Sequence, residues 1–270
     1  MIKAIALDMD NTLLNSQKQI SPLNQQVLKK LHQQGIQIIL CSGRAFGALE
    51  PYLKTLDLLS PEDVCVCFNG GLVRKTGIHE VIAVQSLSKN EIQPLYDLAK
   101  THHFPLDILA EDLVYSLVEL GKSDYQKFLG TLMPFKDTNF AAIPEAGKYL
   151  KVVSEAPTST LSQAAQLTAD LPVTQTRSRA TLLEFLPQGV NKQVGLAAAL
   201  KHFHLTSAEL MAFGDEDNDK EMLTYAGIGV AMGNAVPAIL ALADQVTATN
   251  DQDGVAKALM TAFQLTPQDL

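Results

Sequence analysis

Carboxylates that could hold a metal ion beside a reaction centre stand at two places in the chain, each just after a short apolar run. Asp8 and Asp10 follow the apolar residues 2–7, and the acidic run Asp215 to Asp219 follows the apolar residues 210–213. Carboxylates brought together in a partly dry site repel one another unless a cation shares it. Hard oxygen ligands with room for water favour Mg²⁺ over Zn²⁺. The sequence therefore predicts a magnesium site formed by these two segments.

Three other polar clusters could bind a phosphate group. Ser42 and Gly43 offer a hydroxyl and an unobstructed backbone N–H, and Asn69-Gly70 ends another apolar run. Lys192 opens a predicted helix, where an ammonium group and the helix N-terminus both favour an anion. Each cluster alone also has an ordinary interpretation: a solvated turn for Asp8-x-Asp10, a helix cap for Ser42, and a common helix-start lysine for Lys192.

The elements that must position these residues alternate between strands and helices. Apolar runs at 2–7, 36–41 and 64–68 predict buried strands, and Ser21-Pro22 predicts a helix start. The late part of the chain repeats the pattern, with helices predicted at 192–203, 220–226 and 254–263 and strands at 210–213, 228–231 and 245–248. This order predicts a parallel, doubly wound α/β sheet of the Rossmann-like kind. In such a sheet ligands bind beyond the carboxyl ends of the strands, where all the polar clusters stand.

The middle of the chain differs from its two ends. Helical segments at 90–102 and 160–171 are mixed with alternating, strand-like segments, and Arg177 to Ala180 has the composition of a hairpin corner. We interpret this part as an inserted α+β cap domain. The expected division is a first core part at 1–85, the cap at 86–187 and a second core part at 188–270. The strand-like segments of the cap are predicted at 113–118, 149–153 and 181–185.

Composition limits which partners the protein can bind and in which cell compartment it can act. The 270 residues are 47% hydrophobic and 19% charged, and the net charge of −8 argues against nucleic-acid binding. Cys65 and Cys67 alternate in a strand-like run and are predicted to be buried, and three cysteines fit a reducing cytoplasm. The uncharged residues 222–243 could span a membrane by length, but their glycines and Pro237 favour a strand, a turn and a helix. We expect no membrane partner.

Together, these motifs resemble the haloacid dehalogenase (HAD) superfamily. Its four ordered motifs look like those at 8–13, at 42–44, at Lys192 and at 214–219. The segments 69–71, 183–192, 230–235 and 253–256 further resemble its Cof-type branch. The resemblance covers residues 8–256, and it implies the HAD fold with a cap domain.

The resemblance also implies roles for individual residues. Asp8 would be the nucleophile that forms an aspartyl-phosphate, and Asp10 the general acid and base. The family's Mg²⁺ is held by the Asp8 carboxylate, the Asp10 backbone carbonyl and the Asp215 carboxylate. Lys192 would hold the phosphoryl group and offset its charge. The expected substrate-binding residues are Ser42, Gly43, Arg44, Asn69, Gly70, Asn218 and Asp219, with Asp219 also expected to hold Lys192 or a water molecule.

Two residues depart from the family pattern, and several questions stay open. Asn11 stands where Gly is usual, and Asn191 where Ser is frequent; Asn tolerates unusual backbone angles. The expected activity is that of a phosphomonoester hydrolase acting on a small metabolite such as a sugar phosphate, pyridoxal phosphate or flavin mononucleotide. The alternatives are a phosphoryl transferase or phosphomutase, and a non-catalytic binding protein. The protein is expected to be a monomer or small homo-oligomer. Candidate substrate selectors in the cap are Asp112, Tyr115, Lys151, Arg177 and Arg179.

Overall fold

The computed structural model describes residues 1–130 and 132–270, and these divide into two compact units. The core unit comprises residues 1–44, 49–83 and 191–270, and the cap unit comprises residues 45–48 and 84–190. The cap unit is thus inserted into the core, and its main segment begins and ends within three residues of the expected 86–187. Within the described ranges, no helix is long and apolar enough to cross a membrane.

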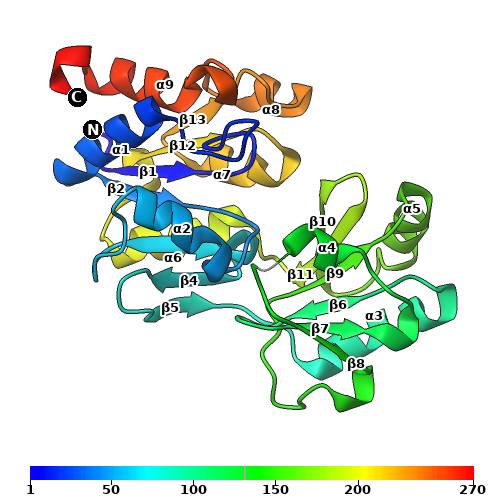
Figure 1. Cartoon of the computed structure of the whole chain (residues 1–270). Helices are drawn as coiled ribbons and strands as arrows, with labels where there is room; N and C mark the ends of the chain where they lie inside the picture. Colours follow the sequence, from blue (N-terminus) through cyan, green and yellow to red (C-terminus); the bar gives the residue numbers. More distant parts are fainter. Residues whose placement is uncertain (131) are drawn as a thin grey trace. The chain divides into compact units, whose positions relative to one another are not determined.

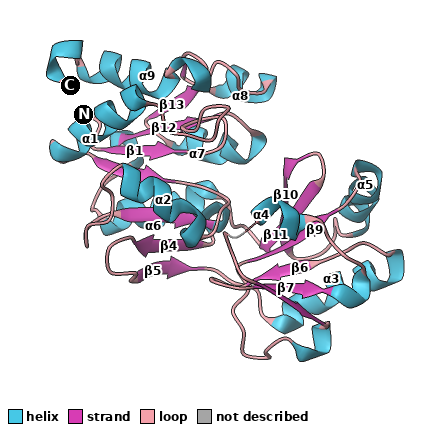
Figure 2. Ribbon diagram, in the orientation of Figure 1, coloured by secondary structure: helices cyan, strands magenta, loops and turns pink. Residues whose placement is uncertain are grey.

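The core unit is built on a parallel sheet in which the first strand of the chain is an interior strand (Figures 1 and 2). The strand order is β14-β13-β12-β1-β2, and all neighbours are parallel. Its strands are β1 (Ala4–Leu7), β2 (Gln37–Leu40), β12 (Leu210–Gly214), β13 (Ile228–Ala231) and β14 (Gln245–Val246). β1 is buried along its whole length, as a strand covered on both faces must be. The predicted Rossmann-like α/β core is confirmed.

Three further strands form a small second sheet beside β2. They are β3 (Val64–Cys67), β4 (Leu72–Lys75) and β5 (Val81–Val84). A parallel bridge between Cys41 and Val66 joins β3 to the end of β2, whereas β3 and β4 are antiparallel. The hairpin strands β4 and β5 were not predicted. Cys65 and Cys67 are buried as predicted, with their sulfur atoms 3.7 Å apart.

Helices cover both faces of the core sheet, as doubly wound folds require. A cluster of buried residues joins one face of β1, β2 and β12 to α6, α7 and α8. On the other side α1 packs against α9 and β2 (Figure 1). The core helices are α1 (Pro22–Gln33), α2 (Phe46–Thr55), α6 (Lys192–His202), α7 (Lys220–Tyr225), α8 (Pro237–Leu242) and α9 (Gly254–Phe263). Residues 222–243 therefore form parts of two helices and a strand, which excludes the membrane-spanning interpretation.

Local sequence explains where the main helices begin. The Ser21 hydroxyl accepts the amide of Asn24, with Pro22 in the first turn of α1, as predicted. The Asn191 side chain accepts the amide of Val194 and so caps α6. Asn191 can therefore do the capping work of the Ser that is frequent at this position.

The cap unit contains a mixed sheet of six strands, and two of its helices pack on one face of the sheet. The strand order is β10-β11-β9-β6-β7-β8; β7 and β8 are parallel, and all other neighbours are antiparallel. The strands are β6 (Asp107–Leu109), β7 (Val114–Leu117), β8 (Phe135–Thr138), β9 (Lys151–Glu155), β10 (Val173–Arg179) and β11 (Leu182–Pro187). The helices are α3 (Lys89–His102), α4 (Tyr125–Leu129) and α5 (Thr158–Leu167), of which α3 and α5 share a buried apolar cluster with the sheet.

The α+β character of the insert is confirmed, but one local prediction is wrong. Arg177 and Arg179 do not form a hairpin corner, because both lie in β10, and the turn into β11 falls at Ala180 and Thr181. Cross-strand pairing with β11 extends the strand to Arg179 in spite of the polar sequence of this segment.

Candidate active site

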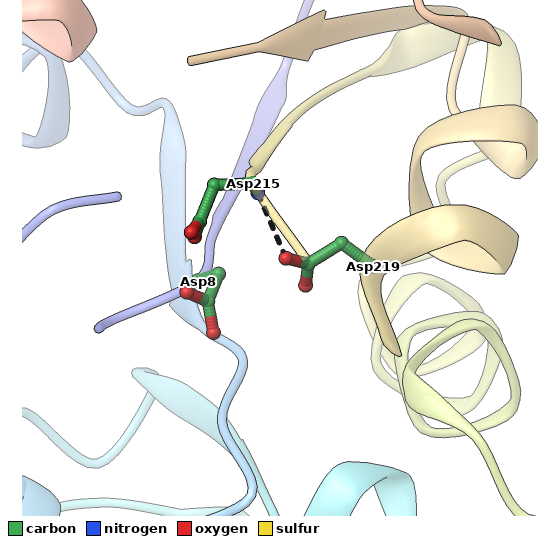
Figure 3. Close-up of side chains that lie close together, drawn as sticks. All are labelled: Asp8, Asp215 and Asp219. Atoms are coloured by element: carbon green, nitrogen blue, oxygen red, sulfur yellow. Dashed lines mark hydrogen bonds between the residues drawn. The ribbon is translucent and has the colours of Figure 1, made fainter. Parts of the chain in front are cut away.

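The site forms where two neighbouring strands of the core sheet end. Asp8 directly follows β1, and its amide still donates to the carbonyl of Phe213 in β12 (3.1 Å). Asp215 directly follows β12, and the register pairs Leu7 with Phe213. Parallel strands in register bring their carboxyl ends to the same edge, so Asp8 and Asp215 meet there. Both are buried. Figure 3 shows their carboxylates facing each other.

Lys192 supplies the cation of this site. Its Nζ atom lies 2.6 Å from an oxygen of Asp8 and 2.6 Å from an oxygen of Asp219, and its side chain is fully buried. Burial alone would lower the pKa of Lys192, but Asp219 and Asp8 raise it above its ordinary value. The lysine is therefore charged at any physiological pH, and it can attract a phosphate group without first being protonated.

Both carboxylate oxygens of Asp219 are engaged by groups of the protein. One carboxylate oxygen accepts from Lys192, and the other accepts from the amides of Asp215 (2.9 Å, the dashed line in Figure 3) and Glu216 (3.1 Å). These contacts fix the start of the loop after β12 and aim Lys192 at Asp8. The expected hold on Lys192 is therefore present in the structure.

The excess of negative charge is what a divalent cation would relieve. Carboxylate oxygens of Asp8, Asp215 and Asp219 lie within 4.8 Å of one another. Burial, only partly offset by Lys192, raises the pKa of Asp8 to about 7. Burial and the nearby Asp8 raise the pKa of Asp215 to about 8, although Thr12 donates a hydrogen bond to it (2.7 Å). Buried oxygen ligands that cannot all ionise comfortably together fit Mg²⁺.

Asp10 does not join this cluster with its carboxylate. Arg44 holds both carboxylate oxygens through contacts of 2.7 to 3.0 Å, and Lys18 adds a further contact at 2.8 Å. The arginine also lies over the ring of Tyr52, 5.5 Å from its centroid. Burial would raise the pKa of Asp10, but Arg44 and Lys18 outweigh it and lower the pKa. The magnesium cluster expected from the two acidic segments therefore gathers the carboxylates of Asp8, Asp215 and Asp219, whereas the charge of the Asp10 carboxylate is neutralised by two cations.

The turn 68–70 packs against Gly43 and against the start of α6. Asn69 is buried in the left-handed region (φ 54°), and its side-chain oxygen accepts from Asn218 (3.3 Å). A Cβ on Gly43 would lie 2.9 Å from that oxygen, so the pair requires glycine there. Gly70 has φ +100°, and a Cβ on it would lie 2.0 Å from the carbonyl of Asn191. Gly70 thus lets this turn approach the start of α6.

Ser42 lies at the same edge of the sheet. It is buried, its amide donates to Val66, and its hydroxyl accepts the amide of Arg44 (3.2 Å). The hydroxyl closes a local turn and does not cap a helix, because α2 begins only at Phe46; the hydroxyl proton can still be donated to an anion.

Sequence reasoning missed several residues that shape this site. Thr12 lies inside the first motif, so its position was a signal, but Lys18 and Tyr52 lie outside every motif. Their contacts with Asp10 and Arg44 depend on packing that no local pattern encodes. Asn234 and Asn250 contact the loop after Asp10, as described below.

A buried aspartate after the first strand, a lysine at a helix start and an acidic loop after a neighbouring strand define a class of hydrolase on a Rossmann-like core. The family model of haloacid dehalogenase-like hydrolases matches residues 5–259, and the chain belongs to this family. The resemblance to the HAD superfamily and its Cof-type branch is confirmed.

Known relatives are similar over nearly the whole chain. A Bacillus subtilis (strain 168) protein, 5-amino-6-(5-phospho-D-ribitylamino)uracil phosphatase YitU, is 30% identical over 283 residues, which cover 97% of each chain. The crystal structure of a haloacid dehalogenase-like hydrolase from Bacteroides thetaiotaomicron is 30% identical, with a TM-score of 0.86 over 97% of this chain and 100% of that one. A subclass IIB sugar phosphatase of the superfamily has the same fold at 24% identity, with a TM-score of 0.82 over 97% of this chain and 99% of the other.

Proposed function

We propose that this protein is a Mg²⁺-dependent phosphatase that hydrolyses a small phosphorylated metabolite through an aspartyl-phosphate on Asp8. The observation that carries the proposal is the buried trio in which Lys192 bridges Asp8 and Asp219 at 2.6 Å on each side. A carboxylate held by a permanent cation beside a second buried carboxylate, Asp215, is arranged to receive a phosphoryl dianion together with a metal ion. When bound, Mg²⁺ would supply charge neutralisation for the phosphoryl oxygens; Asp8, Asp215 and the Asp10 carbonyl would hold it.

In the first step Asp8 acts as the nucleophile. A carboxylate oxygen of Asp8 forms a bond to phosphorus while the bond from phosphorus to the ester oxygen breaks. Asp10 gives a proton to the departing oxygen, which leaves as an alcohol. Lys192 stays charged throughout and stabilises the negative charge that spreads over the phosphoryl oxygens. Ser42 and the backbone N–H of Gly43 are suited to hold those oxygens.

In the second step water breaks the aspartyl-phosphate. Asp10, now ionised, takes a proton from water as its oxygen bonds to phosphorus, and the bond from phosphorus to the Asp8 oxygen breaks. Inorganic phosphate leaves, and the Asp8 carboxylate and the protonated Asp10 are restored. Splitting the reaction into two displacements at one phosphorus lets a single acid–base residue serve both.

The ion pair of Asp10 with Arg44 supports a linkage between substrate binding and proton transfer. Arg44 lowers the pKa of Asp10, which disfavours the protonated form that the first step requires. A phosphoryl group beside Ser42 and Gly43 would compete for the same guanidinium group. Its arrival would therefore weaken the Asp10–Arg44 pair and raise the pKa of Asp10 when the proton is needed.

The family and its relatives suggest which substrates to test. Sugar phosphates, pyridoxal phosphate and flavin mononucleotide are the compounds to test, and the relative YitU adds a phosphorylated ribitylaminouracil. The three free, buried cysteines fit action in a reducing cytoplasm.

The decisive experiment measures phosphate release from this panel with Mg²⁺ and with a chelator, for the wild type and for Asp8→Asn. Asp217→Asn is the matched control, because Asp217 is an exposed carboxylate in the loop after β12. We expect release that needs both Mg²⁺ and Asp8 and survives Asp217→Asn. Release that persists in Asp8→Asn or with chelator would contradict the proposal. Transfer to an added alcohol or sugar phosphate in place of release to water would favour the transferase alternative.

A further inference from the structure

The loop that follows Asp10 is held by two asparagines from the other end of the chain. The side-chain amide of Asn234 donates to the carbonyl of Asn11, and that of Asn250 donates to the carbonyl of Leu14, both at 2.9 Å. These contacts join residues 223 and 236 positions apart, and neither asparagine has a part in the chemistry proposed above. Asn234 lies in one of the two Cof-type segments to which sequence reasoning gave no role.

The two asparagines also bind each other. The backbone amide of Asn250 donates to the side-chain oxygen of Asn234 (2.9 Å). This contact fixes which end of the Asn234 amide is the acceptor, so its NH₂ group must point to Asn11. Asn250 is buried, and water cannot easily replace its donor. The pair therefore acts as one clamp on the loop. Beside it, Asp251 accepts both the amide (2.7 Å) and the hydroxyl (2.6 Å) of Ser16.

The clamped positions are those that control Asp10. Leu14 is fully buried and forms a parallel bridge with Asp10, and its amide donates to the carbonyl of Met9 (2.9 Å). A shift of the Leu14 backbone is therefore passed directly to the backbone of Asp10. The carbonyl and the carboxylate of Asp10 are the two groups of this loop that the proposed reaction uses.

The other clamped residue is the one that departs from the family pattern. Asn11 takes the left-handed conformation (φ 60°) at the position where Gly is usual. A residue with a side chain adopts this conformation less readily than Gly, although Asn tolerates it better than most. The hydrogen bond from Asn234 to the carbonyl of Asn11 helps to keep the turn in place.

We propose that Asn234 and Asn250 are positioning residues of the active site, which fix the loop 11–14 and thereby place Asp10 for metal binding and proton transfer. This inference rests on the proposed function, because it gives Asp10 its role. Neither asparagine touches the substrate or the reacting atoms. Their loss should therefore impair turnover and Mg²⁺ binding while leaving substrate affinity nearly unchanged.

The test compares Asn250→Asp and Asn234→Ala with a matched control. Asn250→Asp keeps the shape but turns an oxygen, not a donor, toward the carbonyl of Leu14. The control is Asn24→Ala: Asn24 is buried and accepts the amide of Ala256 (2.9 Å), a link of similar span that does not reach the loop. We expect both clamp variants to lose kcat by about 10- to 100-fold with KM changed less than about 3-fold. The Mg²⁺ concentration that gives half of the maximal rise in Tm should increase about 10-fold. Asn24→Ala should lower Tm yet keep kcat and the Mg²⁺ response within about 2-fold of the wild type.

A second readout keeps the outcome independent of turnover. Hydrogen exchange, followed by mass spectrometry, should be faster at the amides of residues 9–16 in both clamp variants than in the wild type and in Asn24→Ala. Clamp variants that lose only Tm, with kcat, Mg²⁺ response and exchange unchanged, would overturn the inference. If the wild type released phosphate from no substrate, the proposed function would fail. Unchanged exchange at 9–16 in Asn250→Asp would then overturn the clamp as well, and faster exchange would support it.

Discussion

Each unit of the molecule contains a lysine whose side chain is at most 3% exposed and lies against carboxylates, and the two sites differ in balance. In the cap, Lys151 of β9 meets Glu184 of β11 at 2.7 Å, and both side chains are 3% exposed. In the core, Lys192 meets Asp8 and Asp219, and Asp215 lies beside them. The cap pair matches one cation to one carboxylate. The core site holds three carboxylates to one lysine.

The difference separates a structural pair from a functional site. Burial alone would lower the pKa of Lys151, but Glu184 raises it above its ordinary value, so the lysine stays charged beside its partner. In the core, burial and mutual repulsion raise the pKa of Asp8 to about 7 and that of Asp215 to about 8. A protein keeps such a costly arrangement where a ligand completes it. The same residue types thus indicate packing in one unit and chemistry in the other.

The largest expected effect comes from removing the core lysine. Lys192→Met leaves the Asp8 site without its fixed cation, and we expect kcat to fall by about 10³-fold or more. Steady-state kinetics at saturating Mg²⁺ would measure it. Lys151→Met, assayed well below its Tm, should keep kcat within about 3-fold. Equal losses of kcat in the two variants would remove the distinction between the two sites.

In the cap pair, the expected effect is on stability, and a second apolar substitution should restore most of it. Lys151→Met leaves Glu184 buried without its lysine and should lower the free energy of unfolding by about 3–5 kcal/mol. The double variant Lys151→Met/Glu184→Leu should recover most of this loss, because a balanced buried pair can be replaced by apolar groups of similar size. Urea denaturation of the single and double variants would measure both. No recovery in the double variant would show that the pair does more than fill the cap interior.

The two lysine sites also differ in how well they could be predicted from the sequence. Asp8, Asp215 and Lys192 were found because each stands at the end of an apolar run or at a helix start, and parallel strands carry such positions to one edge. The pairing of Lys151 was not found: alternation in β9 predicts a strand, but the partner Glu184 is set by the register with β11. Lys151 had been considered only as a substrate selector.

Contacts between turns that are far apart in the sequence could not be predicted for a similar reason. The ion pair of Asp10 with Arg44 joins two loops whose side-chain directions depend on the packed sheet. The clamp formed by Asn234 and Asn250 on the loop 11–14 is equally invisible in a local pattern, although Asn234 belongs to a segment that resembles the family. Motifs thus identify the residues that react more readily than the residues that position them.

A third prediction uses pH and Mg²⁺ to separate the two lysine sites. The pKa values of Asp8 and Asp215, about 7 and about 8, lie above the ordinary value of 3.8. For acids with a raised pKa, the contribution to stability is present at low pH and is lost as pH rises through the folded-state values. Tm of the metal-free protein should therefore fall by several degrees, about 4 °C or more, between pH 5.5 and pH 8.5. Mg²⁺ should raise Tm more at pH 8.5 than at pH 5.5.

Variants of the two sites provide the control for this pH dependence. Asp215→Asn should flatten the metal-free curve and abolish most of the Mg²⁺ response, because it removes both the crowded charge and a ligand. Lys151→Met/Glu184→Leu should keep the slope of the wild type. Calorimetry of the three proteins at both pH values measures the effect, and a Tm that rises with pH in the metal-free wild type would contradict it.

The smallest expected effect concerns Asp10, whose negative charge is neutralised by Arg44 and Lys18. Arg44 contacts both of its oxygens, and Arg44→Lys keeps the charge but loses the fork that reaches both. The pKa of Asp10 should therefore rise toward its ordinary value, and the limb of the kcat/KM profile that reports Asp10 should move to higher pH by about half a unit. We expect kcat/KM at neutral pH to change by about 3- to 10-fold, since a phosphate contact of Arg44 is weakened in the same variant.

Tyr52→Leu distinguishes these two contributions. The ring lies against Arg44, and the Tyr52 hydroxyl donates to the carbonyl of Lys18 (3.4 Å), so its removal should loosen the arginine and leave both charges in place. A limb that moves in Arg44→Lys and moves less in Tyr52→Leu would show that the fork sets the pKa of Asp10. If the pH profile of kcat/KM is unchanged in Arg44→Lys, the ion pair between Asp10 and Arg44 is already broken in the reacting complex. The pair would then exist only in the enzyme without substrate.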